Sequence, residues 1–229
     1  MKGCLLIMAG VSLSAGQIAT SPVRIDLSGD KPTAILTVTN EDRAATIIQV
    51  ESAAWEQKEG ADRYAPAPEL LAVPPVFKLE AGEKQLIRVG IRQFPREGEE
   101  SAYRLYLTEV PDASLPAEGI VRVLLRISLP LFVHAGSRGT HALEWQAVCK
   151  EKTMRLAASN RGRAHAKIFD LEIRKQTQNQ SLGRQKAAAY ILAGAQRSWE
   201  FSVAECSEAV RLSYRTEEGS HDVRVVLEE

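Results

Sequence analysis

The sequence predicts an all-β protein built from two immunoglobulin-like β-sandwich domains. Three observations predict this fold: apolar and polar residues alternate in many short segments, turn-forming residues separate these segments, and no segment keeps an apolar stripe of helical period. Short strands in close succession, without helices between them, are typical of antiparallel sandwiches. A chain of 229 residues has room for two such domains of about 100 residues each.

The N-terminal segment, residues 1–16, is expected to be a secretory signal peptide. One lysine precedes a run of apolar and small residues at positions 4–13, and small residues lead to Gly16. The run is too short to cross a bilayer, which takes about 20 apolar residues. Cleavage after Ser14 or Ala19 also fits, and a buried N-terminal strand or helix is the other interpretation.

The predicted strands share an apolar residue at every second position and end near Gly, Pro, Asn or Asp. In chain order they are centred on residues 34–38, 48–50, 86–91, 103–107, 121–129, 156–158, 168–173 and 223–227. The alanine-rich stretch 184–197 looks briefly helical, although its middle fits a strand equally well. A small, flexible stretch follows the fifth strand, so we place the N-terminal domain at residues 17–135 and the C-terminal domain at residues 136–229.

Composition and motifs exclude several classes of function. The chain has 29 Lys and Arg against 29 Asp and Glu, which argues against a nucleic-acid-binding protein. The sequence contains no nucleophile elbow, phosphate-binding loop or metal-ligand spacing. We therefore expect no enzyme activity, no catalytic residues, no metal and no cofactor. No segment is long and apolar enough to insert into a membrane.

Two cysteines, Cys149 and Cys206, remain once the signal segment is removed. An even number of cysteines in an exported protein favours one disulfide bond. Two separately buried thiols are the alternative, because a sequence does not give the distance between two Cα atoms.

The most regular alternation lies in residues 120–133. Its odd positions form one apolar row: Val121, Val123, Leu125, Ile127 and Leu129. The row either faces the core of its own domain or lies on an edge strand, where a partner can reach it. The proline at position 130 favours an edge or a strand end, because proline cannot donate a hydrogen bond to a central strand.

Residues 21–133 resemble, in order, the periplasmic pilus-assembly chaperones of the chaperone–usher pathway. The resemblance rests on SPVR at 21–24, LTVTN at 36–40, VPPVFKLEAGEKQLIRV at 73–89 and ESAYRLYLTEVP at 100–111. The second half of the chain is similar more loosely, at residues 158–162 and 190–194. Residues 127–133 resemble the archaic branch of the family, which assembles thin fimbriae.

The resemblance implies a boomerang-shaped chaperone that works in the periplasm and delivers pilin subunits to an outer-membrane usher. Its alternating strand would complete the fold of a subunit that lacks its last strand, a mechanism called donor-strand complementation. The side chains that would fill the groove of the subunit are Val121, Val123, Leu125 and Ile127. A secreted two-domain structural or adhesive surface protein is the alternative function.

Many relatives of this kind hold the C-terminal carboxylate of the subunit with an early arginine and a lysine late in the donor strand. Arg24 matches the first position, but Pro130 occupies the second. A carboxylate held in a cleft needs a charge-assisted partner. We therefore predict that Arg88 faces the cleft and supplies the second cation, with Arg126 in reserve. The other interpretation of Arg88 is an exposed residue that forms a salt bridge.

Overall fold

The computed structural model describes residues 17–111, 123–176, 180–186, 188–206 and 209–228. These residues form 19 strands and no helix, which confirms the all-β prediction. Accordingly, the described residues hold no helix with the length and hydropathy of a membrane span. The predicted signal segment and Val121 lie outside the described residues.

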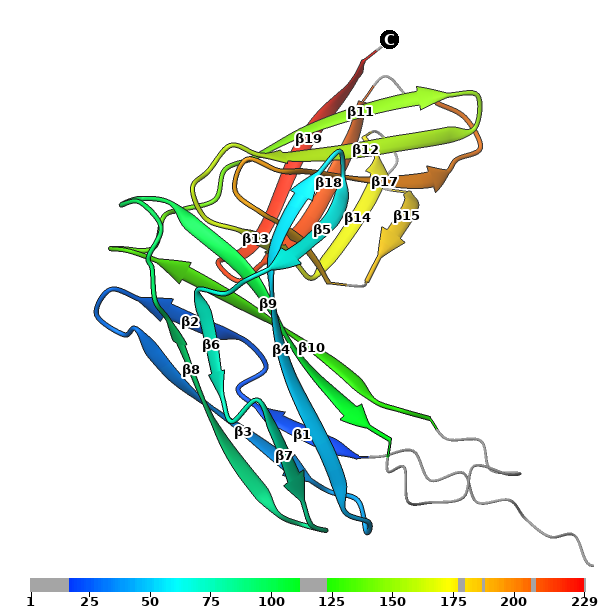
Figure 1. Cartoon of the computed structure of the whole chain (residues 1–229). Helices are drawn as coiled ribbons and strands as arrows, with labels where there is room; N and C mark the ends of the chain where they lie inside the picture. The colour runs from blue at the N-terminus through cyan, green and yellow to red at the C-terminus, as the bar shows by residue number, and fades with distance from the viewer. Residues whose placement is uncertain (1–16, 112–122, 177–179, 187, 207–208, 229) are drawn as a thin grey trace, which may run out of the picture.

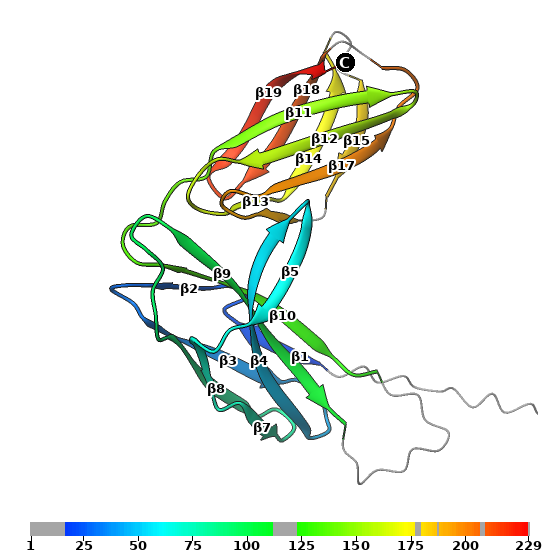
Figure 2. The same ribbon diagram turned by 45° about the horizontal axis from the view of Figure 1, so that its top comes forward.

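Two lobes meet at an angle and give the boomerang shape (Figures 1 and 2). The first lobe is a sandwich of two sheets. One sheet has the order β1 (Ile18–Ser21), β3 (Thr33–Asn40), β8 (Lys84–Ile91) and β6 (Leu70–Val73). The other has the order β2 (Ile25–Ser28), β10 (Arg126–His134), β9 (Glu100–Val110), β4 (Thr46–Lys58) and β5 (Ala61–Pro66), with β7 (Val76–Leu79) paired to β4. Between the sheets, the alternating apolar residues of the strands form one core.

The second lobe is built around a seven-stranded sheet. Its order is β15 (Ser181–Gln185), β14 (Asp170–Lys175), β18 (Ala209–Thr216), β19 (Gly219–Glu228), β11 (Leu143–Lys150), β12 (Thr153–Asn160) and β17 (Gln196–Ser202). A small sheet of β13 (Ala166–Ile168) and β16 (Ala189–Ile191) completes the lobe. The alanine-rich stretch therefore contributes strand β16 rather than a helix, because its apolar side chains are needed in the core.

The joint between the lobes combines polar and aromatic contacts. The β4–β5 hairpin of the first lobe reaches the second, where the Gln57 side chain donates to the Tyr190 carbonyl (3.1 Å) and accepts from the Leu192 amide (2.9 Å). The Phe132 ring of β10 stacks on the His165 ring, with their centroids 3.4 Å apart. These contacts tie the two lobes together.

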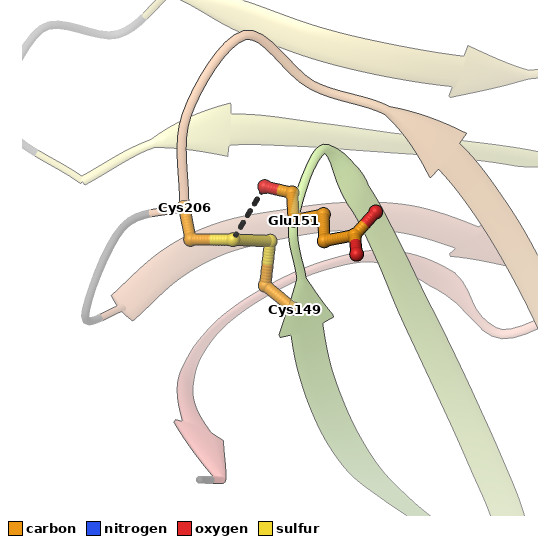
Figure 3. The surroundings of a disulfide bond; sticks show 3 residues. All are labelled: Cys149, Glu151 and Cys206. Atoms are coloured by element: carbon orange, nitrogen blue, oxygen red, sulfur yellow. Dashed lines mark hydrogen bonds between the residues drawn. A yellow bond between two sulfur atoms is a disulfide. The ribbon is translucent and has the colours of Figure 1, made fainter.

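A disulfide joins Cys149 to Cys206 at the end of the second lobe (Figure 3). The two Cα atoms lie 5.8 Å apart, and 57 residues separate the cysteines along the chain. The Cys206 sulfur lies 3.5 Å from the carbonyl oxygen of Glu151, in the turn that connects β11 to β12. The bond therefore links the end of β11 to the segment that follows β17.

Candidate functional site

Strand β10 has two halves with different neighbours. Strand β9 pairs with all of β10, whereas β2 pairs only with residues 131–134. Among the described residues, no strand covers the other side of residues 126–130. Main-chain N–H and C=O groups on an uncovered strand side are a ready template for pairing with another chain. The first half of β10 is therefore an open edge.

The apolar row of β10 continues from the core of the first lobe to this open edge. Leu129, Leu131 and Val133 are at most 3% exposed and belong to the core. Ile127 and Leu125 are half-buried, and Ile127 still packs against that core. Further out, Val123 is 58% exposed. The inner end of the row thus faces the core of its own domain, whereas the outer end lies exposed on the edge strand.

Two hydrogen bonds hold the outer end of this row against the neighbouring strand. The Glu109 amide donates to the Leu125 carbonyl (2.9 Å), and the Leu125 amide donates to the Glu109 carboxylate (3.3 Å). The chain therefore follows β9 beyond the last regular pair of β10, while its apolar side chains lose the cover of the core. The backbone of this outer segment is held in place by hydrogen bonds, while its apolar side chains are exposed.

Arg24 lies directly before β2 and beside Pro130, because the next residue, Ile25, pairs with Leu131. Its Nε donates to Asp26 (2.9 Å), and its Nη1 donates to Glu217 of the second lobe. The hydrogen bond to Glu217 raises the pKa of Arg24, although burial acts in the opposite direction.

The contact with Arg24 also changes the pKa of Glu217. Burial alone would raise the pKa of Glu217, but the hydrogen bond from Arg24 and the charges of Arg24 and Arg138 lower it below its ordinary value. Arg24 and Glu217 therefore form a partly buried ion pair across the joint.

The prediction that Arg88 faces the cleft is wrong. Its neighbours Ile87 and Val89 are fully buried in the core, so alternation turns Arg88 to the exposed outer face of its sheet. There it stands between Ile35 and Val73 on the adjacent strands. Strand β8 belongs to the sheet that does not contain β10, which is why its outward face points away from the cleft.

A cation that sequence reasoning missed is Arg104 of β9. It pairs directly across from Pro130, and its guanidinium carbon lies 3.8 Å from the centroid of the Trp55 ring. Its Nε is buried and has no hydrogen-bond partner among the described residues. Pro130 of β10 thus lies between Arg24, directly before β2, and Arg104 of β9.

As at Arg88, the sequence shows only which way the side chain of Arg104 faces. It lies between Tyr103 and Leu105, which are buried in the core of the first lobe, so it must face the other way. Arg126, the residue held in reserve, shares that face and lies over the Tyr106 ring at 4.2 Å. It is 58% exposed, so it stands at the rim of this cationic face.

The described residues contain no group of three or more side chains suited to a metal ion. What the arrangement offers is an ordered apolar edge next to two arginines. Such a combination can pair with a strand and bind a carboxylate at its end, but it does not by itself break covalent bonds.

Known proteins are similar to this chain in sequence and in fold. The family model described as "Pili and flagellar-assembly chaperone, PapD N-terminal domain" matches residues 17–135. Chaperone protein PapD of Escherichia coli is 25% identical over 151 residues, which cover 62% of this chain. The match spans 61% of the length of that relative.

Solved structures extend the likeness in fold to nearly the whole chain. A chain of the CsuC–CsuE chaperone–tip adhesion subunit pre-assembly complex, from archaic chaperone-usher Csu pili of Acinetobacter baumannii, has a TM-score of 0.72 at 21% identity. The likeness covers 93% of this chain and all of that chain. A chain of the Salmonella enterica SafA pilin–SafB chaperone complex gives 0.65 at 17% identity and covers 94% of this chain and 99% of its own.

Proposed function

The chain belongs to the family of pili and flagellar-assembly chaperones, and from that premise we propose that it binds pilin subunits in the periplasm by donor-strand complementation. The observation that carries this proposal is the single apolar row of β10, which leaves the core of the first lobe and continues along an open edge. The resemblance of residues 127–133 and the fold likeness to an archaic chaperone-usher complex support the archaic branch.

The open edge supplies the two interactions that strand addition needs. Main-chain groups of residues 126–130 pair with a strand of the subunit and give affinity without regard to sequence. Val123 and Leu125, together with Val121 and Ile127, enter its groove and fix the register. Each fully buried side chain of this type contributes about 1.5–3 kcal/mol before ordering costs. Binding therefore needs no cofactor in this proposal.

We assign the carboxylate anchor to Arg24 and Arg104, on either side of Pro130. Neighbouring strands lie about 5 Å apart, so Arg24 and Arg104 are separated by about 10 Å across the sheet. A single carboxylate placed over Pro130 is therefore within reach of both guanidinium groups. Charge-assisted hydrogen bonds from two guanidinium groups would offset the cost of removing that carboxylate from water. The position of Arg104 directly across from Pro130 supports its place in the anchor.

Delivery to an outer-membrane usher requires a surface that the bound subunit does not cover. The outer face of the first sheet exposes four apolar side chains around Arg88: Ile35, Leu71, Val73 and Leu86. This face belongs to the sheet that does not contain β10. We propose that it contacts the usher, so that Leu86→Ser blocks pilus assembly and leaves subunit binding intact.

The central experiment is co-expression with pilin genes of the same genome, followed by pull-down from the periplasmic fraction. The double variant Val123→Asp with Leu125→Asp should lose the subunit while the chaperone stays folded. Val226→Asp, an equally exposed valine of the second lobe (62%), is the matched control. Unchanged recovery of the subunit by the double variant refutes the donor assignment, and unfolding of the chaperone alone assigns the row to its own core.

A second experiment tests the anchor. Arg24→Ala and Arg104→Ala should each weaken subunit binding by about 2–5 kcal/mol if the carboxylate is desolvated, and the double variant should lose less than the sum. Arg88→Ala, on the outer face, is the control and should bind like the unaltered chain. Losses that persist with a subunit truncated by its C-terminal residue would place the anchor elsewhere.

A further inference from the structure

The guanidinium of Arg24 already holds two carboxylates in the free chain. Asp26 accepts from its Nε, and Glu217, which is 193 residues away in sequence, accepts from its Nη1. The side chains of Arg24 and Glu217 are 26% and 33% exposed, so the contact is neither sealed nor fully solvated. A third carboxylate would have to share or replace these partners.

Glu217 also ends a chain of polar contacts that crosses the joint. Arg138 Nη2 lies 3.8 Å from the second carboxylate oxygen of Glu217 and 3.1 Å from His165 Nε2. Because a guanidinium only donates, Nε2 accepts, and the proton of the ring stays on Nδ1. That Nδ1 faces Glu100 of β9 at 2.8 Å.

The charges in this network do not favour a further anion. Two guanidinium groups, Arg24 and Arg138, stand against three carboxylates, those of Asp26, Glu217 and Glu100. In contrast, Arg104 stacks on a ring and keeps an unpartnered Nε within the described part of the chain. An arriving carboxylate therefore meets one arginine, Arg24, that already holds two carboxylates, and another, Arg104, that lies against the Trp55 ring and interacts with the Tyr64 hydroxyl.

We infer that Glu217 competes with the C-terminal carboxylate of the subunit for Arg24 and thereby lowers the affinity of the chaperone for its subunit. This inference rests on the proposed anchor. The exchange replaces one carboxylate by another on the same guanidinium, so the local net charge is kept once Glu217 turns to solvent. Its position in the short turn between β18 and β19 leaves the side chain room to do so. Glu217 would thus make a tight complex easier to release.

The test measures how the chaperone binds two synthetic peptides. Both carry the last twelve residues of a pilin encoded in the same genome, one with a free carboxylate and one with a carboxamide. Glu217→Gln should bind the free acid about fivefold more tightly, the effect of removing a competing ion pair of about 1 kcal/mol, and should bind the amide unchanged. Glu217→Asp keeps the charge but shortens the reach, so its gain should be smaller.

Glu218→Gln is the matched control, because Glu218 lies in the same turn and its carboxylate faces His141 rather than Arg24. It should bind both peptides like the unaltered chain. In an Arg24→Ala background, Glu217→Gln should change nothing, since the contested group is gone. Thermal unfolding of each variant verifies that the joint remains folded.

Three results overturn the inference: Glu217→Gln binds the free acid no better or more weakly, it gains equally for the amide, or its gain survives Arg24→Ala. The proposed anchor fails in a different way, when the unaltered chain does not distinguish the acid from the amide. In that case the anchor and the competition are both refuted. If acid and amide are distinguished and Glu217→Gln has no effect, only the competition is refuted.

Discussion

The two lobes finish their sheets in opposite ways. In the second lobe, the two outermost strands of the sheet, β15 and β17, pack against each other, and a Cβ added to Gly183 would lie 2.3 Å from the Phe201 ring. In the first lobe, half of β10 stays uncovered on one side. The same kind of sandwich thus serves as a closed support in one lobe and as an open template in the other. The two lobes differ in whether the edge strands of their sheets are covered, and not in the kind of strands they contain.

Breaking the disulfide should give the largest loss of stability, and the loss should be confined to the second lobe, because both cysteines belong to that lobe. Replacing Cys149 and Cys206 by serine should destabilise the second lobe by about 4 kcal/mol in the chain-entropy model for a loop of this length. Urea unfolding of the purified protein measures this loss. Thiol counting on the denatured, unreduced chain should find no free thiol, and two titratable thiols would contradict the prediction.

The next comparison lies within β10. Leu131→Ala removes a fully buried side chain of the first core and should cost about 3 kcal/mol of unfolding free energy. Val123→Ala, on the open end of the same row, should change it by less than about 0.5 kcal/mol. Both values come from urea unfolding of the free chain. Equal losses would show that the open end is core, and the contrast between the two halves would fail.

Closure of the second lobe depends on the missing side chain of Gly183. Gly183→Ala forces β15 away from Phe201 and should cost about 2 kcal/mol, as overpacking does in a dense interior. Gly136→Ala is a suitable control, because its added Cβ would meet the Glu97 side chain at an ordinary 3.7 Å. A Gly183→Ala variant as stable as the unaltered chain would mean that the two edges are not closely packed.

The smallest effect concerns the joint between the lobes and depends on pH. The pKa of Glu217 lies below its ordinary 4.5, so its ion pair stabilises the folded chain above about that pH. This contribution disappears as the pH falls through the lowered pKa. Melting temperatures of the unaltered chain and Glu217→Gln should differ near neutral pH and converge in acid. Parallel curves throughout would contradict the role of the ion pair.

Alternation predicted seven strands, β3, β4, β8, β9, β10, β12 and β19, because a half-buried strand repeats its apolar residues every two positions whatever sheet it joins. It missed others, such as β11 and β18, and merged β13 with β14. The row at residues 121–129 left a core strand and an edge strand both open, and the proline after it favoured the edge. They could not show that the row divides between two environments. That division follows from β2, which joins β10 only at residue 131 and lies about a hundred residues earlier in the chain.

The cations show where sequence reasoning ends. Arg88 and Arg104 have the same local pattern, an arginine between two buried residues of an alternating strand. One faces solvent on the outer sheet, and the other lies against Trp55 on the face of the joint. Only the stacking of the two sheets distinguishes them. The contact of Arg24 with Glu217 was equally hidden, because no local pattern links residues 193 positions apart.

The hydrogen bonds of Gln57 have a consequence for the thermodynamics of binding. A side-chain amide that both donates to and accepts from the backbone of the other lobe fixes the angle between the lobes in the free chain. The freedom of the two lobes to change their relative orientation is then lost when the chain folds, so binding of a ligand does not have to pay this entropy cost. A preorganised cleft keeps more of each contact energy as affinity. The hairpin that carries Gln57 therefore contributes to binding through the orientation of the two lobes.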